Sequence, residues 1–190
     1  MNDVEILTLK ERNISDFAEA RNRLLQRAKS KWVLFIDSDE KVSDELASEM
    51  SSLDPSNFSG FFIKRKIVFL SKVVGEDKVL RLARRSGGKW KRKVHETWQI
   101  KGEVGTLKNY IIHNTAYNLH DYIVKINTYS SIHAAENLYE GKYSNLFKII
   151  LYAKIKFIQN ILARRGVVFS MLQSFHSFLG WAKQWELQKD

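Results

Sequence analysis

The chain has 190 residues, 44% of them hydrophobic, which is enough for one domain with a core and a small appendage. It has no cysteine, no run of about 18 apolar residues and no N-terminal signal pattern, which excludes disulfides, thiolate metal sites and a membrane-spanning helix. The formal net charge of +10 favours an anionic partner, which could be a nucleic acid, a nucleotide or an anionic membrane surface.

The first part of the sequence predicts a strand, a helix and a second strand. Residues 4–9 alternate weakly between apolar and polar, as in a short strand. Asp16 has the position of an N-cap, with Glu19 three residues later and apolar residues following at helical spacing. The apolar run 32–36 is rich in β-branched and aromatic residues, which predicts a strand buried on both faces. This order predicts a parallel pair of strands with a right-handed crossover.

Two aspartates, Asp37 and Asp39, follow the second strand at its carboxyl end, where open α/β sheets bind ligands. If the backbone stays extended through Ser38, both carboxylates point to the same side and repel each other unless a cation or a proton lies between them. Such oxygen ligands suit Mg²⁺ or Mn²⁺ that also holds substrate phosphates. The alternative is an acidic turn before the next helix, whose start resembles an N-cap at Ser43.

The middle of the chain predicts a short helix and then a mixed or antiparallel extension of the sheet. The helix is expected over residues 44–53. Strands are expected in three segments, 60–74, 77–84 and 107–113. A basic and aromatic segment, 89–98, lies between them and could bind an anionic acceptor or be a solvated loop.

The last third predicts helices. From Asn118 the apolar residues recur at helical spacing, beginning with a stripe of Leu119, Tyr122, Ile126, Tyr129 and His133. Residues 146–185 mix apolar and aromatic side chains with Lys and Arg. Basic amphipathic helices lie at anionic membrane surfaces, so this stretch predicts peripheral membrane association. The alternative is a tail that packs on its own catalytic domain.

Four motifs, taken in order, resemble family 2 glycosyltransferases of the GT-A fold. They are Asp16–Asn22 with Trp32–Glu40, then Val79–Arg84, then Val94–Glu96, and then Ile112–His113. The set is similar to the branch that contains lipopolysaccharide-core β-1,4-glucosyltransferases. The resemblance implies an α/β fold: a truncated GT-A (Rossmann-like) mixed sheet with a helical C-terminal tail. It divides the chain into a partial catalytic domain, 1–115, and a helical region, 116–190, and the family's first strand, helix and strand have no counterpart.

The resemblance implies an inverting transfer of a hexose from a nucleotide-sugar donor to a cell-envelope glycan or lipid-linked acceptor. Asp37 and Asp39 match the motif that holds a divalent metal, Mg²⁺ or Mn²⁺, and the donor diphosphate, and His113 matches a histidine that completes the metal shell. Arg21 matches an arginine near the nucleotide, and Glu96 matches the catalytic base. Candidates for binding the acceptor or a phosphate are Arg81, Arg84, His95 and Trp98.

The base has one alternative. Glu96 lies between Trp90 and Trp98, and aromatic rings beside a carboxylate can exclude water and stack on a sugar. Glu76 and Asp77 are the other candidates, because an acidic pair before an arginine-rich strand also occurs in such enzymes.

Two other functions compete with glycosyl transfer. A haloacid dehalogenase-like phosphatase also has Asp-x-Asp after an apolar strand, but its pattern continues with Gly and Thr or Val, whereas Glu40 and Lys41 follow here. A non-enzymatic basic module for nucleic acid or anionic membrane, or an inactive fragment, would need no aspartates. We expect a cytoplasmic protein on the inner face of the cytoplasmic membrane, with a nucleotide-sugar donor and no nucleic-acid partner.

Overall fold

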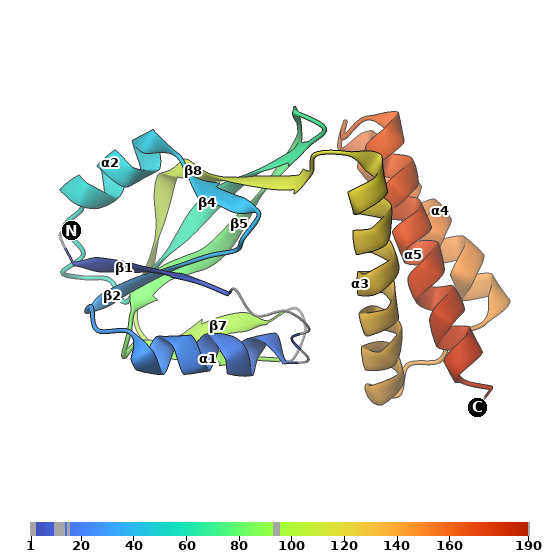
Figure 1. Cartoon of the computed structure of the whole chain (residues 1–190), viewed down its shortest axis with the longest axis horizontal. Coiled ribbons are helices and arrows are strands. Elements are labelled where there is room, and N and C mark those ends of the chain that lie inside the picture. Colours follow the sequence, from blue (N-terminus) through green and yellow to red (C-terminus); the bar gives the residue numbers. More distant parts are fainter. Residues whose placement is uncertain (1–2, 10–13, 15, 93–95, 190) are drawn as a thin grey trace. The chain divides into compact units, whose positions relative to one another are not determined.

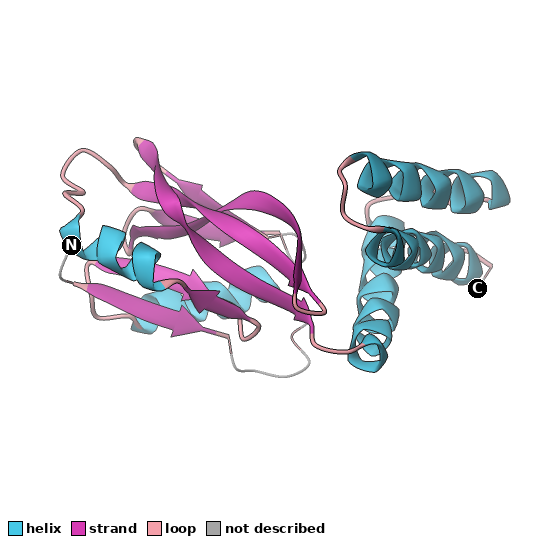
Figure 2. Cartoon of the chain, turned by 90° about the horizontal axis from the view of Figure 1, so that it is seen from above, coloured by secondary structure: helices cyan, strands magenta, loops and turns pink. Residues whose placement is uncertain are grey.

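The computed structural model describes residues 3–9, 14, 16–92 and 96–189. The chain divides into two compact units, one of residues 1–67 and 76–113 and the other of residues 68–75 and 114–190. We call them the sheet unit and the helical unit (Figures 1 and 2). The helical unit includes residues 68–75, the tip of a β-hairpin that the sequence analysis placed in the catalytic domain.

The main sheet has six strands in the order β1-β2-β5-β4-β8-β3. Their bounds are Val4–Thr8 (β1), Trp32–Ile36 (β2), Glu40–Val42 (β3), Gly60–Phe69 (β4), Lys72–Arg84 (β5) and Val104–Ala116 (β8). β1 and β2 are parallel, whereas β2 pairs with β5 and β3 pairs with β8 in antiparallel fashion. A second sheet contains β6 (Gly88–Lys91) and β7 (Thr97–Ile100). The sheet is therefore mixed, as the sequence predicted.

β2 is buried on both faces, which confirms the prediction from its apolar run. Alternate residues of a strand point to opposite faces, so Trp32, Leu34 and Ile36 enter one core with α2 (Asp44–Ser52). Val33 and Phe35 enter a second core with α1 (Phe17–Arg27) and the β6–β7 sheet. Figure 1 shows α1 and α2 on opposite sides of β2.

The helix starts follow their predicted caps. The Asp16 side chain accepts a hydrogen bond from the Glu19 backbone N–H at 2.8 Å, and Ser43 caps α2 in the same way through the N–H of Leu46. α1 connects two parallel strands, so the predicted strand–helix–strand unit is confirmed. β2 ends at Ile36 and α2 begins at Asp44, so seven residues separate the carboxyl end of β2 from the start of α2.

Residues 60–74 are rich in β structure, as expected, but they belong to two strands, because β4 ends at Phe69 and β5 begins at Lys72. Leu70 and Ser71 form the turn with φ of 47° and 63°. A two-residue hairpin turn needs positive φ at both central positions, for which Asn-Gly is the usual signal. Leu-Ser carries no such signal, so the hairpin could not be found by local pattern.

The helical unit contains α3 (Leu119–Tyr139), α4 (Leu146–Leu162) and α5 (Val167–Leu187), and α5 packs against both other helices. Tyr122 and Ile126 of α3 enter a small core with Phe169 of α5. The predicted α3 stripe is only partly right, since the buried residues are Tyr122, Ile126, Ser130 and Ala134. The buried residues follow one another at intervals of four, along one narrow line of the helix. Leu119 and Tyr129 lie off this line and are exposed.

The α/β class, the mixed sheet and the helical C-terminal region are thus confirmed. The arrangement is consistent with the Rossmann-like fold that the resemblance implied.

Candidate active site

The two aspartates after β2 lie in a turn rather than in an extended segment. The Glu40 N–H donates to the Asp37 carbonyl at 2.9 Å, and the Asp37 N–H donates to Glu40 Oε2 at 3.0 Å. The chain has to bend here because Glu40 already belongs to β3, which pairs with β8 and not with β2. The condition of an extended backbone through Ser38 is therefore not met, and the carboxylates of Asp37 and Asp39 bind different partners.

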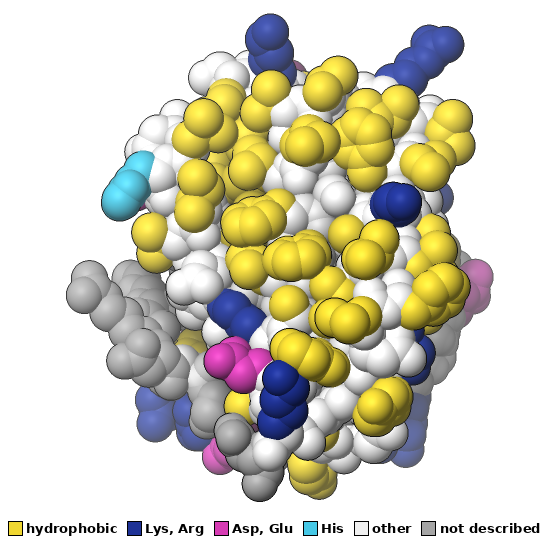
Figure 3. All heavy atoms as spheres, turned by 90° about the vertical axis from the view of Figure 1, so that its right-hand side faces the viewer, with side chains coloured by type: hydrophobic (Ala, Val, Ile, Leu, Met, Phe, Trp, Pro, Cys, Tyr) yellow, Lys and Arg dark blue, Asp and Glu magenta, His cyan; other side chains and the backbone are white. Residues whose placement is uncertain are grey.

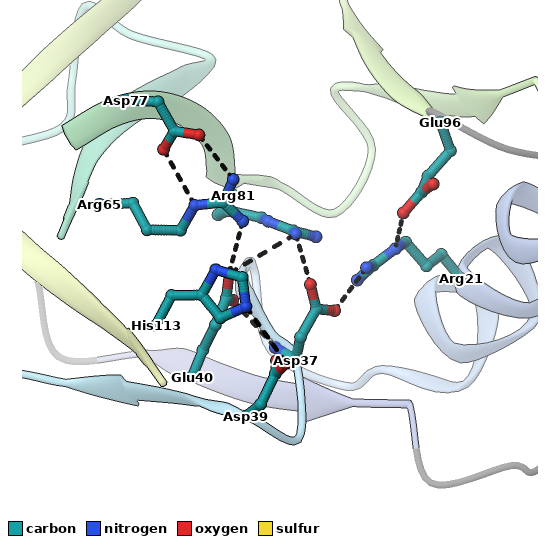
Figure 4. Close-up of polar contacts among 9 residues, drawn as sticks. All are labelled: Arg21, Asp37, Asp39, Glu40, Arg65, Asp77, Arg81, Glu96 and His113. Atoms are coloured by element: carbon teal, nitrogen blue, oxygen red, sulfur yellow. Dashed lines mark hydrogen bonds and ion pairs between the residues drawn. The ribbon is translucent and has the colours of Figure 1, made fainter. Parts of the chain in front are cut away.

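Asp37 lies between two buried arginines (Figure 4). Its Oδ1 accepts from Arg21 Nη2 at 2.5 Å, and its Oδ2 accepts from Arg81 Nη2 at 2.6 Å. Burial raises the pKa of Asp37, but the charges of Arg81 and Arg21 outweigh burial, so the pKa lies below the ordinary value of 3.8. The Asp37 carboxylate is therefore ionised, and it forms ion pairs with both guanidinium groups.

Aromatic rings hold both guanidinium groups in place. The Arg21 guanidinium lies 4.9 Å from the Trp90 ring centroid and 5.5 Å from that of Phe35, and Arg81 lies 5.8 Å from Trp90. Within the described residues, the buried Nη1 atoms of Arg21 and Arg81 have no hydrogen-bond partner. A buried guanidinium N–H without a partner is costly, and such groups are typical of sites that bind an anion.

A second ion cluster supports the first and was not found from the sequence. The Glu40 side chain is fully buried and accepts from Arg65 Nη1 at 2.9 Å. Arg65 also donates to both carboxylate oxygens of Asp77, at 2.9 and 2.7 Å. Burial lowers the pKa of Arg65, but the hydrogen bonds that Arg65 donates to Asp77 and Glu40 outweigh burial and raise the pKa above its ordinary value. Asp77, one alternative for the base, is thus bound in a bidentate ion pair.

Burial also acts on Arg81, which links the two clusters. Its Nη2 lies 3.9 Å from Glu40 Oε1 as well as next to Asp37. Burial lowers the pKa of Arg81 below its ordinary value, and Asp37 only partly compensates. Glu76, the other alternative for the base, is an exposed residue of β5.

Asp39 and His113 meet on the other side of the turn. The antiparallel register of β3 and β8 places His113 opposite Glu40, so the histidine lies beside the acidic turn. His113 Nε2 lies 3.1 Å from Asp39 Oδ2. This distance is that of a hydrogen bond, and of the three expected metal ligands the structure brings Asp39 and His113 together in this way. Across the described part of the chain, no group of three or more His, Asp or Glu side chains could hold a metal by itself.

Glu96 lies next to the same arginine as Asp37. Its Oε1 accepts from Arg21 Nε at 3.0 Å, and its side chain is 15% exposed. Arg21 therefore connects the acidic turn to Glu96 across 75 residues of sequence. Asn22 fixes the neighbouring strand, because its side chain exchanges two hydrogen bonds of 2.9 Å with the Trp90 backbone. His95, a candidate from the sequence, lies outside the described residues.

Arg84 and Trp98 have structural partners and do not join this cluster. Arg84 donates to the carbonyls of the 55–58 segment and lies 5.1 Å from the Trp32 ring centroid. Trp98 is 4% exposed and stacks on Trp90 at 5.1 Å, with the Phe35 ring against both. The two tryptophans thus pack the core under Arg21, so neither offers the exposed ring on which a sugar was expected to stack.

Comparison with known proteins found a glycosyltransferase. The chain is 26% identical over 184 residues to the lipopolysaccharide core biosynthesis glycosyltransferase LpsC of Rhizobium meliloti (strain 1021). The match covers 88% of this chain and 68% of the relative's length. No protein-family model matches the chain. The similarity supports a glycosyltransferase-like relationship and a role in glycosyl transfer.

Proposed function

We propose that this protein is a family 2 glycosyltransferase with a GT-A fold that moves a hexose, with inversion, from a nucleotide-sugar donor to a cell-envelope glycan or lipid-linked acceptor. One observation carries the proposal: the acidic turn after β2 is flanked by two buried arginines, Arg21 and Arg81, with unpartnered N–H groups among the described residues. The distant relative with a glycosyltransferase name supports the same reaction class.

The arginines supply the electrostatic part of the reaction. When the sugar leaves, negative charge grows on the donor diphosphate, and fixed cations stabilise that charge most strongly where water is excluded. Arg21 and Arg81 are buried and are oriented by Asp37 and the Trp90 ring. They therefore need little reorganisation to bind the diphosphate oxygens.

Asp39 and His113 are the proposed ligands of a divalent metal, because their side chains meet beside the acidic turn at 3.1 Å. Two protein ligands are typical of Mg²⁺ sites in which substrate phosphates and water complete the shell. When bound, the metal would neutralise the leaving diphosphate.

Glu96 is the proposed base. Inverting transfer needs one carboxylate near the acceptor hydroxyl and away from the metal ligands. Arg21 orients Glu96 through Oε1 without occupying Asp39 or His113. The acceptor is proposed to lie at the inner face of the cytoplasmic membrane, in line with the lipopolysaccharide core role in the relative's name.

Donor binding tests the anion site and the metal together. We expect a nucleotide diphosphate sugar to bind more tightly in Mn²⁺ than in a chelator, and Asp39→Asn to reduce that difference by at least about tenfold. Asp44→Asn, an exposed carboxylate at the start of α2, is the matched control and should bind like wild type. Equal affinity for the donor in Mn²⁺ and in chelator would contradict a role for the metal in donor binding.

Turnover tests the base. Glu96→Gln keeps the shape and removes the basicity, so it should lower turnover by roughly 10² to 10⁴ while donor affinity stays near wild type. Glu103→Gln, at an exposed position before β8, is the matched control. Full turnover in Glu96→Gln together with loss of turnover in Asp77→Asn would move the base to Asp77.

A further inference from the structure

The helical unit has an exposed apolar face on α4 and α5 (Figure 3). On α4 the large apolar side chains that are exposed are Leu146, Phe147, Ile150, Tyr152, Ile155, Ile158, Ile161 and Leu162. On α5 they are Val167, Val168, Met171, Phe175, Phe178 and Leu187. In contrast, Ile149 and Asn160 are the buried residues of α4. Contiguous exposed apolar area of this extent is typical of an interaction site.

The charge of this segment is one-sided. Residues 141–185 contain seven Lys or Arg and no Asp or Glu, so they contribute +7 of the net charge of +10. The basic residues are Lys142, Lys148, Lys154, Lys156, Arg164, Arg165 and Lys183. By comparison, α3 contains Asp121 and Glu136 among its 21 residues. Apart from Leu187, which follows Glu186, the apolar residues of the face therefore lie in a part of the chain whose charged residues are all Lys or Arg.

We propose that the α4–α5 face docks on an anionic lipid surface, with its apolar side chains at the boundary of headgroups and acyl chains and its Lys and Arg at the headgroup phosphates. Amphipathic helices of this composition bind in the interface plane, driven by apolar burial and attraction to anionic lipid. This inference names the surface that brings the proposed enzyme to a membrane acceptor. Its test needs neither donor nor acceptor, so it can fail without the proposed reaction failing.

The charge of residues 141–185 favours a lipid surface over a second copy of the chain as the binding partner of the α4–α5 face. A second copy docked on the same face would bring another +7 segment against the first, which like-charge repulsion opposes. Lipid phosphates instead complement both properties, since a bilayer offers negative charge and an apolar layer at one surface.

No helix in the described part of the chain combines the length and apolarity needed to cross a membrane.

Vesicle co-sedimentation of the full chain tests the proposal. We expect binding to phosphatidylcholine vesicles that contain phosphatidylglycerol, weak binding to pure phosphatidylcholine, and loss of binding in high salt. The double variant Ile158→Ser/Leu162→Ser should weaken binding by at least about tenfold, because both side chains are more than half exposed on the face. Ile123→Ser/Val124→Ser, at comparably exposed sites of α3, is the matched control and should bind like wild type.

Two double variants that each remove two positive charges separate electrostatic attraction to this face from the effect of the net charge of the chain. Lys154→Gln/Lys156→Gln should weaken binding by about fivefold for each charge removed. Lys101→Gln/Lys108→Gln removes the same charge from exposed positions of the sheet unit and should change binding by less than twofold. Equal losses in both variants would show a general charge effect and overturn the docking face.

Fluorescent labelling locates the contact. Because the chain has no cysteine, Ile158→Cys and Ser48→Cys each give a single labelling site, on α4 and on α2. An environment-sensitive dye at position 158 should shift to the blue on anionic vesicles, and the dye at 48 should not. Far-UV circular dichroism confirms folding of each variant. Unchanged vesicle binding in the folded α4 variants, or a dimer in wild type that Ile158→Ser/Leu162→Ser abolishes, would overturn the proposal.

Discussion

The two units bury polar groups of different kinds. The sheet unit buries the charges of Arg21, Glu40 and Arg81, whereas the buried polar side chains of the helical unit are uncharged: Ser130, Ser144, Asn160, Ser170 and Gln184. A buried charge is costly unless it is paired, so the sheet unit depends on specific ion pairs. Some of these uncharged side chains bind carbonyls of their own helix, such as Ser170 to Gly166, whereas Ser144 and Gln184 bind the distant carbonyls of Trp181 and Lys142.

The two units also differ in where their apolar side chains lie. The apolar side chains of the sheet unit lie mainly in its two cores, while α4 and α5 expose theirs. Exposed apolar groups contribute little to folding, so the helical unit carries a surface that stability does not require. Under the two proposals, the buried charges of the sheet unit serve the chemistry and the exposed face of the helical unit serves membrane contact.

The largest expected effect breaks the buried charge network. Arg21→Met removes one of the two arginine partners of Asp37 and the arginine that binds Glu96, so we expect the free energy of unfolding to fall by about 3–5 kcal/mol. Arg23→Met on the same helix removes an exposed pair with Glu19 and should cost less than about 1 kcal/mol. Urea unfolding of both variants measures the difference. Similar losses of unfolding free energy in the two variants would mean that burial of the charge network adds nothing to stability.

The next effect depends on pH. The pKa of Asp37 is lowered by folding, so its stabilisation is present above the unfolded value of about 3.8 and is lost as pH falls through the folded value. Asp37→Asn should therefore reduce the free energy of unfolding by about 1.5–3 kcal/mol at pH 7. The difference from wild type should shrink as pH falls below 3.8, as urea titrations at several pH values would show. A constant difference across pH would contradict the ion-pair origin.

The smallest effect concerns the helical surface. Ile158→Ser should change the free energy of unfolding by less than about 0.5 kcal/mol, because this side chain is exposed. Ile126→Ala, in the small core of α3, should cost about 2–4 kcal/mol in the same assay. A large loss of unfolding free energy in Ile158→Ser would mean that the exposed face packs against protein, which would contradict the difference between the two units.

Local patterns determined the elements of the fold. The caps at Asp16 and Ser43 and the apolar run of β2 appear in the structure where they were predicted, because each depends on residues within one turn or strand. The position of the acidic residues after β2 was also predictable. The turn at Leu70–Ser71 was not, since its residues lack the usual glycine signal.

Tertiary structure alone decided the partners in the candidate site. Arg65 meets Glu40 across 25 residues, Arg81 meets Asp37 across 44, and His113 meets Asp39 across 74. Such pairs depend on strand order and register, which arise from packing summed over the whole sheet rather than from any local period. The same packing buries Trp98, which the sequence had placed in an acceptor site. The acidic motif and the family resemblance pointed to the carboxylates and arginines of this site, but only the assembled sheet determined which arginine neutralises which carboxylate.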